Sequence, residues 1–259
     1  TDKPSSSING SDMHPNAVCS SEAPSTYSSR VKTDEGNGGT LAKQFTITIT
    51  DGNDPPTDIT LDNDTVAENQ PSGTPVGSFS TTDNPGDSHT YVLTDTINYP
   101  DNAAFTIGGL GGDQLQTSAV FNFEAKSSYT IRVRSTDDGG LWYEKVFTIT
   151  ITDANDAPTD ISLDNSSVAE NQVIGTAVGN FNTTDPDTGD SHTYVLTDTA
   201  SYPDNAAFTI GGVGGDQLQT NAVFNFEAKS SYAIRVQTSD GNGGVLNKVF
   251  TITITDATD

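Results

Sequence analysis

The sequence predicts an all-β protein built from tandem Greek-key β-sandwich domains arranged end to end. Residues 100–133 return as residues 203–236 with only three differences, and such long-period similarity indicates an array of like domains. Each copy spans roughly 100 residues, the size of a small β-sandwich. Apolar residues alternate with threonine in short runs that clusters of Gly, Asn, Asp and Pro separate, which is typical of sandwich strands.

The repeat pattern divides the chain into three parts. We expect the C-terminal half of one repeat at residues 1–54, a complete repeat at 55–156 (the middle repeat) and another at 157–259 (the C-terminal repeat). Residues 27–51 align without gaps with residues 232–256, which identifies the partial copy. Because half a sandwich cannot bury its own apolar face, we expect this part to be poorly ordered or completed by another chain.

The strands of the middle repeat are predicted from apolar residues that recur at every second position. Phe147, Ile149 and Ile151 alternate with threonines in residues 146–153, which predicts an antiparallel strand with one buried face. The same pattern predicts a strand at residues 129–136. Shorter strands are expected at 74–81, 89–95, 103–107 and 113–117, so each repeat has six or seven strands and no segment with helical periodicity.

The composition is strongly acidic. The 35 acidic residues outnumber 11 basic ones, for a net charge of −24. This charge argues against nucleic acid and anionic membrane surfaces as partners, and no apolar run is long enough for membrane insertion in this segment. A single cysteine, Cys19, excludes an intrachain disulfide and is interpreted as a small buried hydrophobic residue.

Clusters of acids mark the junctions between repeats. The first junction carries DGNDPPTDI at residues 51–59 and the second carries DANDAPTDI at residues 153–161. Carboxylates this close repel one another unless a cation lies among them, and oxygen ligands favour hard ions such as Ca²⁺. Further acids recur at fixed places in the repeats: Glu68 and Glu170, Glu124 and Glu227, Asp137 and Asp240, with Asp185 and Asp187 in the loop DPDTGD.

Two other motifs are given structural interpretations. GGLGGDQLQ at residues 108–116 fits the calcium nonapeptide of β-roll proteins, but a β-roll needs several stacked copies, so we expect a glycine-rich hairpin turn. His89 and His192 follow Asp and Ser directly. Neighbours on a strand point to opposite faces, so these residues do not form a catalytic triad, and we expect the histidines to begin a strand. The sequence therefore predicts no enzyme.

The order of these motifs resembles the cadherin repeat, and more closely the cadherin-like domains of large bacterial surface proteins. In sequence they are VAEN, an acidic loop, FNFEA, a long strand followed by Asp, and finally D-x-N-D-x-P. The resemblance covers nearly the whole chain. It implies cadherin-like, immunoglobulin-like sandwiches on the cell surface, with Ca²⁺ bound between successive domains.

The resemblance also implies the ligands. At the second junction they would be Glu68, Glu124, Asp153, Asn155, Asp156, Asp185, Asp187 and Asp240, and at the first junction Glu22, Asp51, Asn53, Asp54, Asp83 and Asp137. The sequence departs from the family pattern where Asn122 replaces a carboxylate and where Asn84 and Pro85 follow Asp83. We therefore expect a poorer calcium site at the first junction.

These features predict a calcium-stiffened extracellular rod from a bacterial adhesin or biofilm protein, with calcium and the neighbouring repeats as its partners. Two alternatives stay open, and their partners would be other copies of the chain and surface glycans. One is a self-assembling filament subunit, completed by strands from a neighbouring chain. The other is a carbohydrate-binding module, for which Trp142, Tyr99 and Tyr202 are the candidate aromatic residues.

Overall fold

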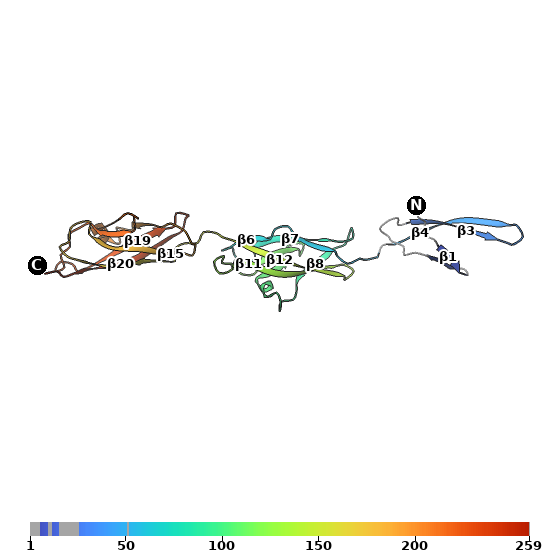
Figure 1. Ribbon diagram of the computed structural model, residues 1–259, viewed down its shortest axis with the longest axis horizontal. Coiled ribbons are helices and arrows are strands. Elements are labelled where there is room, and N and C mark those ends of the chain that lie inside the picture. The colour runs from blue at the N-terminus through green and yellow to red at the C-terminus, as the bar shows by residue number, and fades with distance from the viewer. Residues whose placement is uncertain (1–5, 10–11, 16–25, 51, 259) are drawn as a thin grey trace. The chain divides into compact units, whose positions relative to one another are not determined.

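A computed structural model describes residues 6–9, 12–15, 26–50 and 52–258 (Figure 1). Two compact units make up the chain, and each is described by itself. The first comprises residues 1–64, 73–118 and 130–148, and the second comprises residues 65–72, 119–129 and 149–259. The described residues contain no helix that is long and apolar enough to cross a bilayer.

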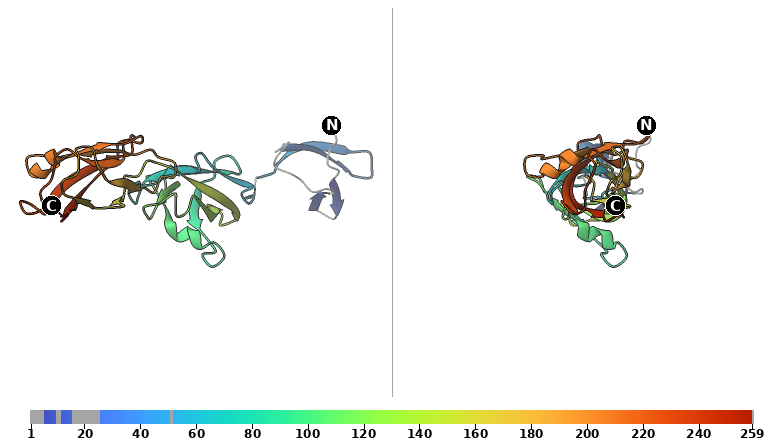
Figure 2. Two further views of the ribbon diagram at one scale, coloured as in Figure 1. Left: turned by 60° about the vertical axis from the view of Figure 1, so that its left-hand side comes forward. Right: turned by 90° about the vertical axis from the view of Figure 1, so that its left-hand side faces the viewer.

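The C-terminal repeat is a sandwich of two four-stranded sheets (Figures 1 and 2). The sheet orders are β13-β15-β18-β17 and β14-β20-β19-β16, and neighbouring strands are antiparallel except for the parallel pair β14 and β20. The elements are β13 Asp160–Leu163, β14 Ser167–Ala169, β15 Ala177–Thr184, β16 Thr193–Leu196, the 3₁₀-helix η2 Pro203–Ala207, β17 Phe208–Gly211, β18 Gln217–Thr220, β19 Ser231–Ser239 and β20 Val245–Thr255.

Alternating side chains of these strands form its core. Ile234 and Val236 of β19 and Ile252 and Ile254 of β20 are fully buried, in alternation with more exposed residues. Phe181 of β15 stacks on Tyr194 with ring centroids 5.3 Å apart. Each buried aliphatic side chain stabilises the fold by about 1.5–3 kcal/mol relative to exposure, which ties the two sheets together.

The middle repeat has the same elements in the same order, with sheets β5-β7-β10-β9 and β6-β12-β11-β8. They are β5 Asp58–Leu61, β6 Thr65–Ala67, β7 Pro75–Thr82, β8 His89–Leu93, the 3₁₀-helix η1 Pro100–Ala104, β9 Phe105–Gly108, β10 Gln114–Thr117, β11 Ser128–Asp137 and β12 Trp142–Thr152. Ile131, Ile149 and Ile151 are fully buried, so the strands predicted at residues 129–136 and 146–153 are confirmed.

Each of these repeats has eight strands, where six or seven were expected. The difference arises because the first strand is split between the two sheets, as β13 and β14 in the C-terminal repeat. At the break, the Asn165 side chain donates to the carbonyls of Ser167 and Val178. Strands of three or four residues are too short for an alternating pattern to be recognised in the sequence.

The N-terminal part contains two strand pairs. Strand β1 (Ser6–Asn9) pairs with β2 (Asp12–Pro15), and β3 (Thr26–Asp34) pairs with β4 (Thr40–Thr48). Every residue of β4 is exposed, including Leu41 at 71 %, whereas Ile252 and Ile254 in the equivalent strand β20 are fully buried. The apolar side chains of β4 are thus left open to solvent. Cys19 lies outside the described residues.

The glycine-rich segment at residues 108–114 is a hairpin turn. Gly108 of β9 pairs with Gln114 of β10, and Leu110 at the tip is fully exposed. Val213 occupies the same exposed position in the C-terminal repeat. The hairpin prediction is therefore confirmed.

Candidate metal centre

The site at the second junction starts from Glu68, at the end of the short strand β6. Although ionisable, Glu68 is fully buried. One carboxylate oxygen accepts the backbone N–H of Phe123 at 2.7 Å and the other accepts that of Ala154 at 2.9 Å. Asn69 follows with a φ of 60°, a left-handed conformation that Asn adopts more readily than most residues. The VAEN motif thus positions one acid between the FNFEA turn and the linker.

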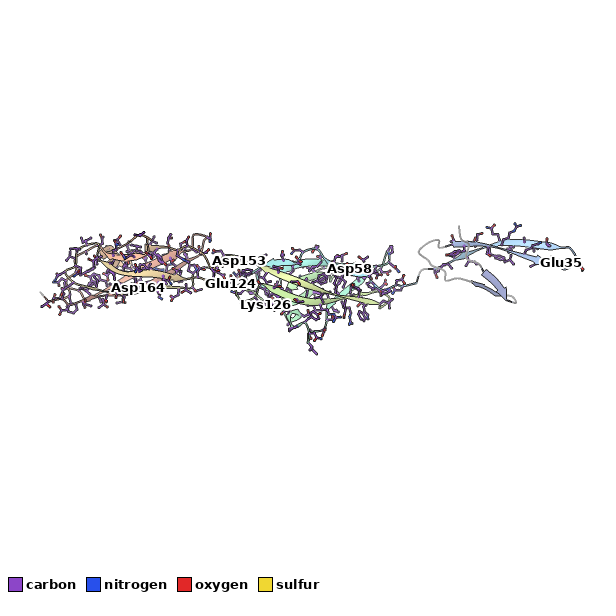
Figure 3. All side chains as sticks on the ribbon, in the orientation of Figure 1. Glu35, Asp58, Glu124, Lys126, Asp153 and Asp164 are labelled. Atoms are coloured by element: carbon purple, nitrogen blue, oxygen red, sulfur yellow. The ribbon has the colours of Figure 1, made fainter. Side chains whose placement is uncertain are left out.

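Two further acids lie beside Glu68. One carboxylate oxygen from each of Glu68, Glu124 and Asp153 lies within 4.8 Å of the others. Figure 3 shows Glu124 and Asp153 at the same end of the middle repeat. Glu124 comes from the FNFEA turn and Asp153 directly follows β12, so three separate segments contribute to one acidic group.

The linker acid Asp156 joins this group to the next repeat. The Asn69 side chain donates to Asp156 at 2.7 Å, and the Asp156 backbone N–H donates to the Asp187 carboxylate at 2.7 Å. Carboxylate oxygens of Glu124, Asp156 and Asp187 also lie within 4.8 Å of one another. Glu124 therefore belongs to two acidic groups, one reaching back to Glu68 and one reaching forward to Asp187.

Asp187 carries an unsatisfied oxygen. Its Oδ1 is buried and has no hydrogen-bond partner among the described residues, while its Oδ2 accepts from Asp156. A buried polar atom without a partner costs free energy unless a ligand satisfies it. Asp187 also groups with Asp185 and Asp190 in the loop DPDTGD, so it is shared between two groups as Glu124 is.

Electrostatic repulsion contributes to raised pKa values of two of these acids. Burial, with the negative charges of Asp187 and Glu68, raises the pKa of the Asp153 carboxyl above its usual value. The pKa of Glu124 is lowered by a hydrogen bond from its own backbone N–H, but burial and the charges of Glu68, Asp156 and Asp187 outweigh it and raise the pKa overall. A cation among these carboxylates would remove that repulsion.

Asp240 contacts the linker from the C-terminal repeat. The Asn155 side chain donates to Asp240 Oδ2 at 3.0 Å, and the backbone N–H groups of Asn242, Gly243 and Gly244 donate to Oδ1. These bonds, that from Asn155 foremost, lower the pKa of Asp240 despite its burial. A Cβ at Gly244 would lie 2.8 Å from the Cα of Ala157, so the linker passes close to this loop.

The acids converge on an open cavity of about 580 Å³, whose lining residues include Glu124, Asp153, Asp187 and Asp190. Carboxylate oxygens are the donors that Ca²⁺ prefers, and it takes six to eight of them in flexible geometry. The shared carboxylates of Glu124 and Asp187 and the orphaned oxygen of Asp187 fit such an ion.

The first junction is built differently. The Asn53 side chain donates to Asp137 at 3.0 Å, the counterpart of the Asn155–Asp240 contact. Asp83 binds His89, Asp54 is exposed, and Asp87 has one buried oxygen without a partner. Among the described residues no three acids here have carboxylate oxygens within 4.8 Å of one another, although burial and the charges of Asp138, Asp83 and Asp137 raise the pKa of Asp87. The predicted ligands Glu22 and Asp51 lie outside the described residues.

Four acids of the structural groups are absent from the ligand set predicted from the sequence. Asp190 closes the loop DPDTGD, and Glu170, Glu227 and Asp256 form a group at the far end of the C-terminal repeat. Glu170 accepts the backbone N–H groups of Phe226 and Ala257, as Glu68 accepts those of its own repeat. Repetition could have found this group, because each member aligns with a member of the Glu68 group.

Residues 164–255 match the family model of the Cadherin domain. The chain carries tandem cadherin repeats. Among curated proteins, protocadherin Fat 4 of Mus musculus is 29 % identical over 198 residues, which covers 75 % of this chain and 4 % of the relative. The protocadherin-like wing polarity protein stan of Drosophila melanogaster is 32 % identical over 205 residues, 75 % of this chain and 6 % of the relative. The chain thus spans a small fraction of these animal proteins.

Solved structures of cadherin repeats share the fold. PcdhgB3 EC1-4 has a TM-score of 0.68 at 23 % identity, covering 98 % of this chain and 64 % of that chain. Mouse protocadherin-24 EC1-3 has a TM-score of 0.67 at 18 % identity, covering 97 % and 86 %. The predicted fold class of tandem β-sandwiches is confirmed by these matches.

The cadherin family is a non-enzymatic adhesion family of the cell surface, and as a member of it this segment is extracellular and non-enzymatic. The family typically binds Ca²⁺ at acidic sites between domains, and acidic groups are present here. These two relatives are animal proteins, so the finer resemblance to bacterial surface proteins has no support from them.

Proposed function

We propose that this segment binds Ca²⁺ at the second junction and that the bound ion holds two successive cadherin repeats at a fixed angle. Glu68, Glu124, Asp153, Asp156 and Asp187 would hold the metal. The observation that carries the proposal is the sharing of Glu124 between the Glu68–Asp153 group and the Asp156–Asp187 group. A cation bound there would be coordinated by both repeats at once.

Two properties of the acids support this proposal. The raised pKa values of Glu124 and Asp153 reflect repulsion that a divalent ion would cancel. The orphaned Oδ1 of Asp187 is an oxygen for which the described part of the chain provides no donor. Asp185 would ligate through the same loop, whereas Asn155 and Asp240 would act mainly by bonding to each other.

The first junction would bind calcium more weakly. Its downstream loop reads DNPGD, with Asn84 and Pro85 in the part of the loop where the C-terminal repeat places Asp187. Asp83, Asp137, Asn53 and Asp54 stay candidate ligands there. Fewer carboxylates lower the affinity of a calcium site.

The parent would be an adhesion protein whose array of repeats is stiffened by calcium, and it would contact other copies of itself through such repeats. This inference rests on the adhesion family of the matching relatives. A bacterial adhesin or biofilm protein as the parent stays a prediction.

Thermal unfolding in millimolar Ca²⁺, in excess chelator and in Mg²⁺ tests the calcium site. Binding to the native state alone should stabilise it by about 1.4 kcal/mol per site at tenfold excess over Kd. We expect Ca²⁺ to raise the melting temperature and Mg²⁺ at equal ionic strength to do so much less. Equal curves in all three conditions would refute the proposal.

A second candidate function is self-association through the hairpin β3–β4. Its side chains Leu41, Phe45 and Ile47 are 71 %, 43 % and 37 % exposed, which is unusual for one face of a sheet. Light scattering after size exclusion separates the two cases: a concentration-dependent dimer supports association, and a monomer at all concentrations refutes it.

Carbohydrate binding stays a prediction. Trp142 is 53 % exposed, with the Arg134 guanidinium 4.5 Å from its ring centroid. Tyr99 has Arg132 over its ring and Tyr202 has Arg235. A glycan array with the Trp142→Ala variant as control tests this function.

A further inference from the structure

A histidine contacts the first acid of the downstream loop in both complete repeats. His192 Nε2 lies 2.8 Å from Asp185 Oδ2, with the two side chains 14 % and 3 % exposed. His89 Nε2 lies 2.9 Å from Asp83 Oδ2, with 13 % and 2 % exposed. His89 begins β8 and His192 immediately precedes β16, so a strand that belongs to the sandwich core supports each ring.

The other oxygen of each aspartate is held by the loop itself. The Asp187 backbone N–H donates to Asp185 Oδ1 at 3.2 Å, and the Asn84 backbone N–H donates to Asp83 Oδ1 at 2.9 Å. A carboxylate with both oxygens bonded from different sides cannot rotate freely about χ2. The histidine therefore fixes the direction in which the remaining lone pairs of Asp185 point.

The chemistry of the pair favours a histidine that orients Asp185 over a histidine that binds the metal itself. Ca²⁺ selects oxygen and not imidazole nitrogen, and each carboxylate oxygen has two acceptor sites, so Asp185 can accept from the ring and still bind a metal. The acidic group of this loop consists of Asp185, Asp187 and Asp190. Groups that hydrogen-bond to a metal ligand typically change metal affinity by about 10- to 100-fold when removed.

We propose that His192 is a positioning residue for the calcium ligand Asp185. This inference rests on the proposed function of the second junction. His89 is the matched control: it holds Asp83 in the same way, but the acid corresponding to Asp187 is missing from its loop. His192 should therefore act on calcium affinity at the second junction, whereas His89 should not.

Isothermal titration of the full chain with CaCl₂ tests the proposal. The calcium-binding step of the second junction is defined as the step whose affinity Asp187→Asn lowers. We expect His192→Leu to weaken this step about tenfold. The variant His192→Gln keeps an N–H donor at a similar distance and should recover most of the affinity. His89→Leu should leave this step unchanged.

Melting temperatures in excess chelator separate positioning from a structural role. A structural pair predicts that His192→Leu and His89→Leu lose similar stability without metal and that the calcium affinity of the folded protein is unchanged. That result, or failure of His192→Gln to recover affinity, overturns the proposal. If the wild-type chain shows no calcium step, the proposed function fails and the inference fails with it.

Discussion

The loops at residues 83–87 and 185–190 occupy equivalent places in the two complete repeats, after β7 and β15, but their sequences differ: DNPGD in the first and DPDTGD in the second. Both begin with an aspartate bonded to a histidine. Only the second places three carboxylates, Asp185, Asp187 and Asp190, within reach of one ion. A nearly identical sandwich thus supports two different junctions, because a change of a few loop residues alters the ligands without altering the strands.

The largest expected effect is the loss of folding stability when Glu68 at the second junction is replaced. Glu68→Ala leaves the N–H groups of Phe123 and Ala154 without their partner, at about 1–3 kcal/mol for each buried donor. We expect a loss of about 3 kcal/mol in the free energy of unfolding even in chelator, measured by urea denaturation.

Glu170→Ala is the matched variant, because Glu170 makes the same two contacts in the C-terminal repeat. It should also destabilise the protein in chelator, but it should leave calcium binding at the second junction intact. Loss of calcium binding in both variants would contradict the assignment of Glu68 to that junction.

The next effect is on calcium binding through Asp187, which groups with Asp185 and Asp190 in the second loop. Asp187→Asn removes one carboxylate and should weaken calcium binding about tenfold. At calcium tenfold above the wild-type Kd, about 1 kcal/mol of calcium-dependent stabilisation should disappear, as thermal unfolding would detect. Asp87→Asn, at the other buried orphan oxygen, should change the calcium response less. Equal effects would mean that the two loops bind calcium alike.

Grafting the second loop onto the first tests whether the loop decides the difference. Replacing residues 83–87 with DPDTGD should add calcium-binding capacity at the first junction and raise the stoichiometry in a calorimetric titration. A graft with Asn at the second acid, DPNTGD, is the control and should add little. An unchanged stoichiometry with DPDTGD would show that the residues around the loop, and not the loop, limit the first junction.

Features that depend on neighbouring residues in the sequence could be predicted, whereas features that depend on contacts between distant residues could not. Alternation predicted the long strands β11 and β12, and repetition located Glu68, Glu124 and Asp153 before any geometry was known. The hydrogen bonds of Glu68 join residues more than 50 positions apart, so no local pattern indicates that this acid is fully buried. The pairing of His192 with Asp185 was missed for a related reason: the sequence places His192 beside Asp190, and only the fold of the loop brings it to Asp185.

The smallest expected effect is on the pH dependence of folding stability in the absence of metal. The raised pKa values of Glu124 and Asp153 mean that the native state binds more protons than the unfolded chain just above pH 4, so stability rises as the pH falls toward that range. The lowered pKa values of Asp137 and Asp240 act oppositely, since their stabilisation is lost as the pH falls below about 4.

The melting temperature in chelator should therefore rise as the pH is lowered from about 7 toward the titration range of the Glu124 and Asp153 carboxyls, and Asp153→Asn should reduce that rise. A melting temperature that falls steadily from pH 7 would show that the acids of the second junction do not repel one another.

The most direct measurement of the central claim is a distance distribution across the second junction with and without Ca²⁺. Spin labels at Leu110→Cys and Val213→Cys, on the exposed hairpin tips of the two repeats, in a Cys19→Ser background, suit pulsed electron spin resonance. Calcium should narrow the distribution and chelator should broaden it, with Asp187→Asn staying broad in calcium. Distributions of equal width in calcium and in chelator would contradict a calcium-locked junction.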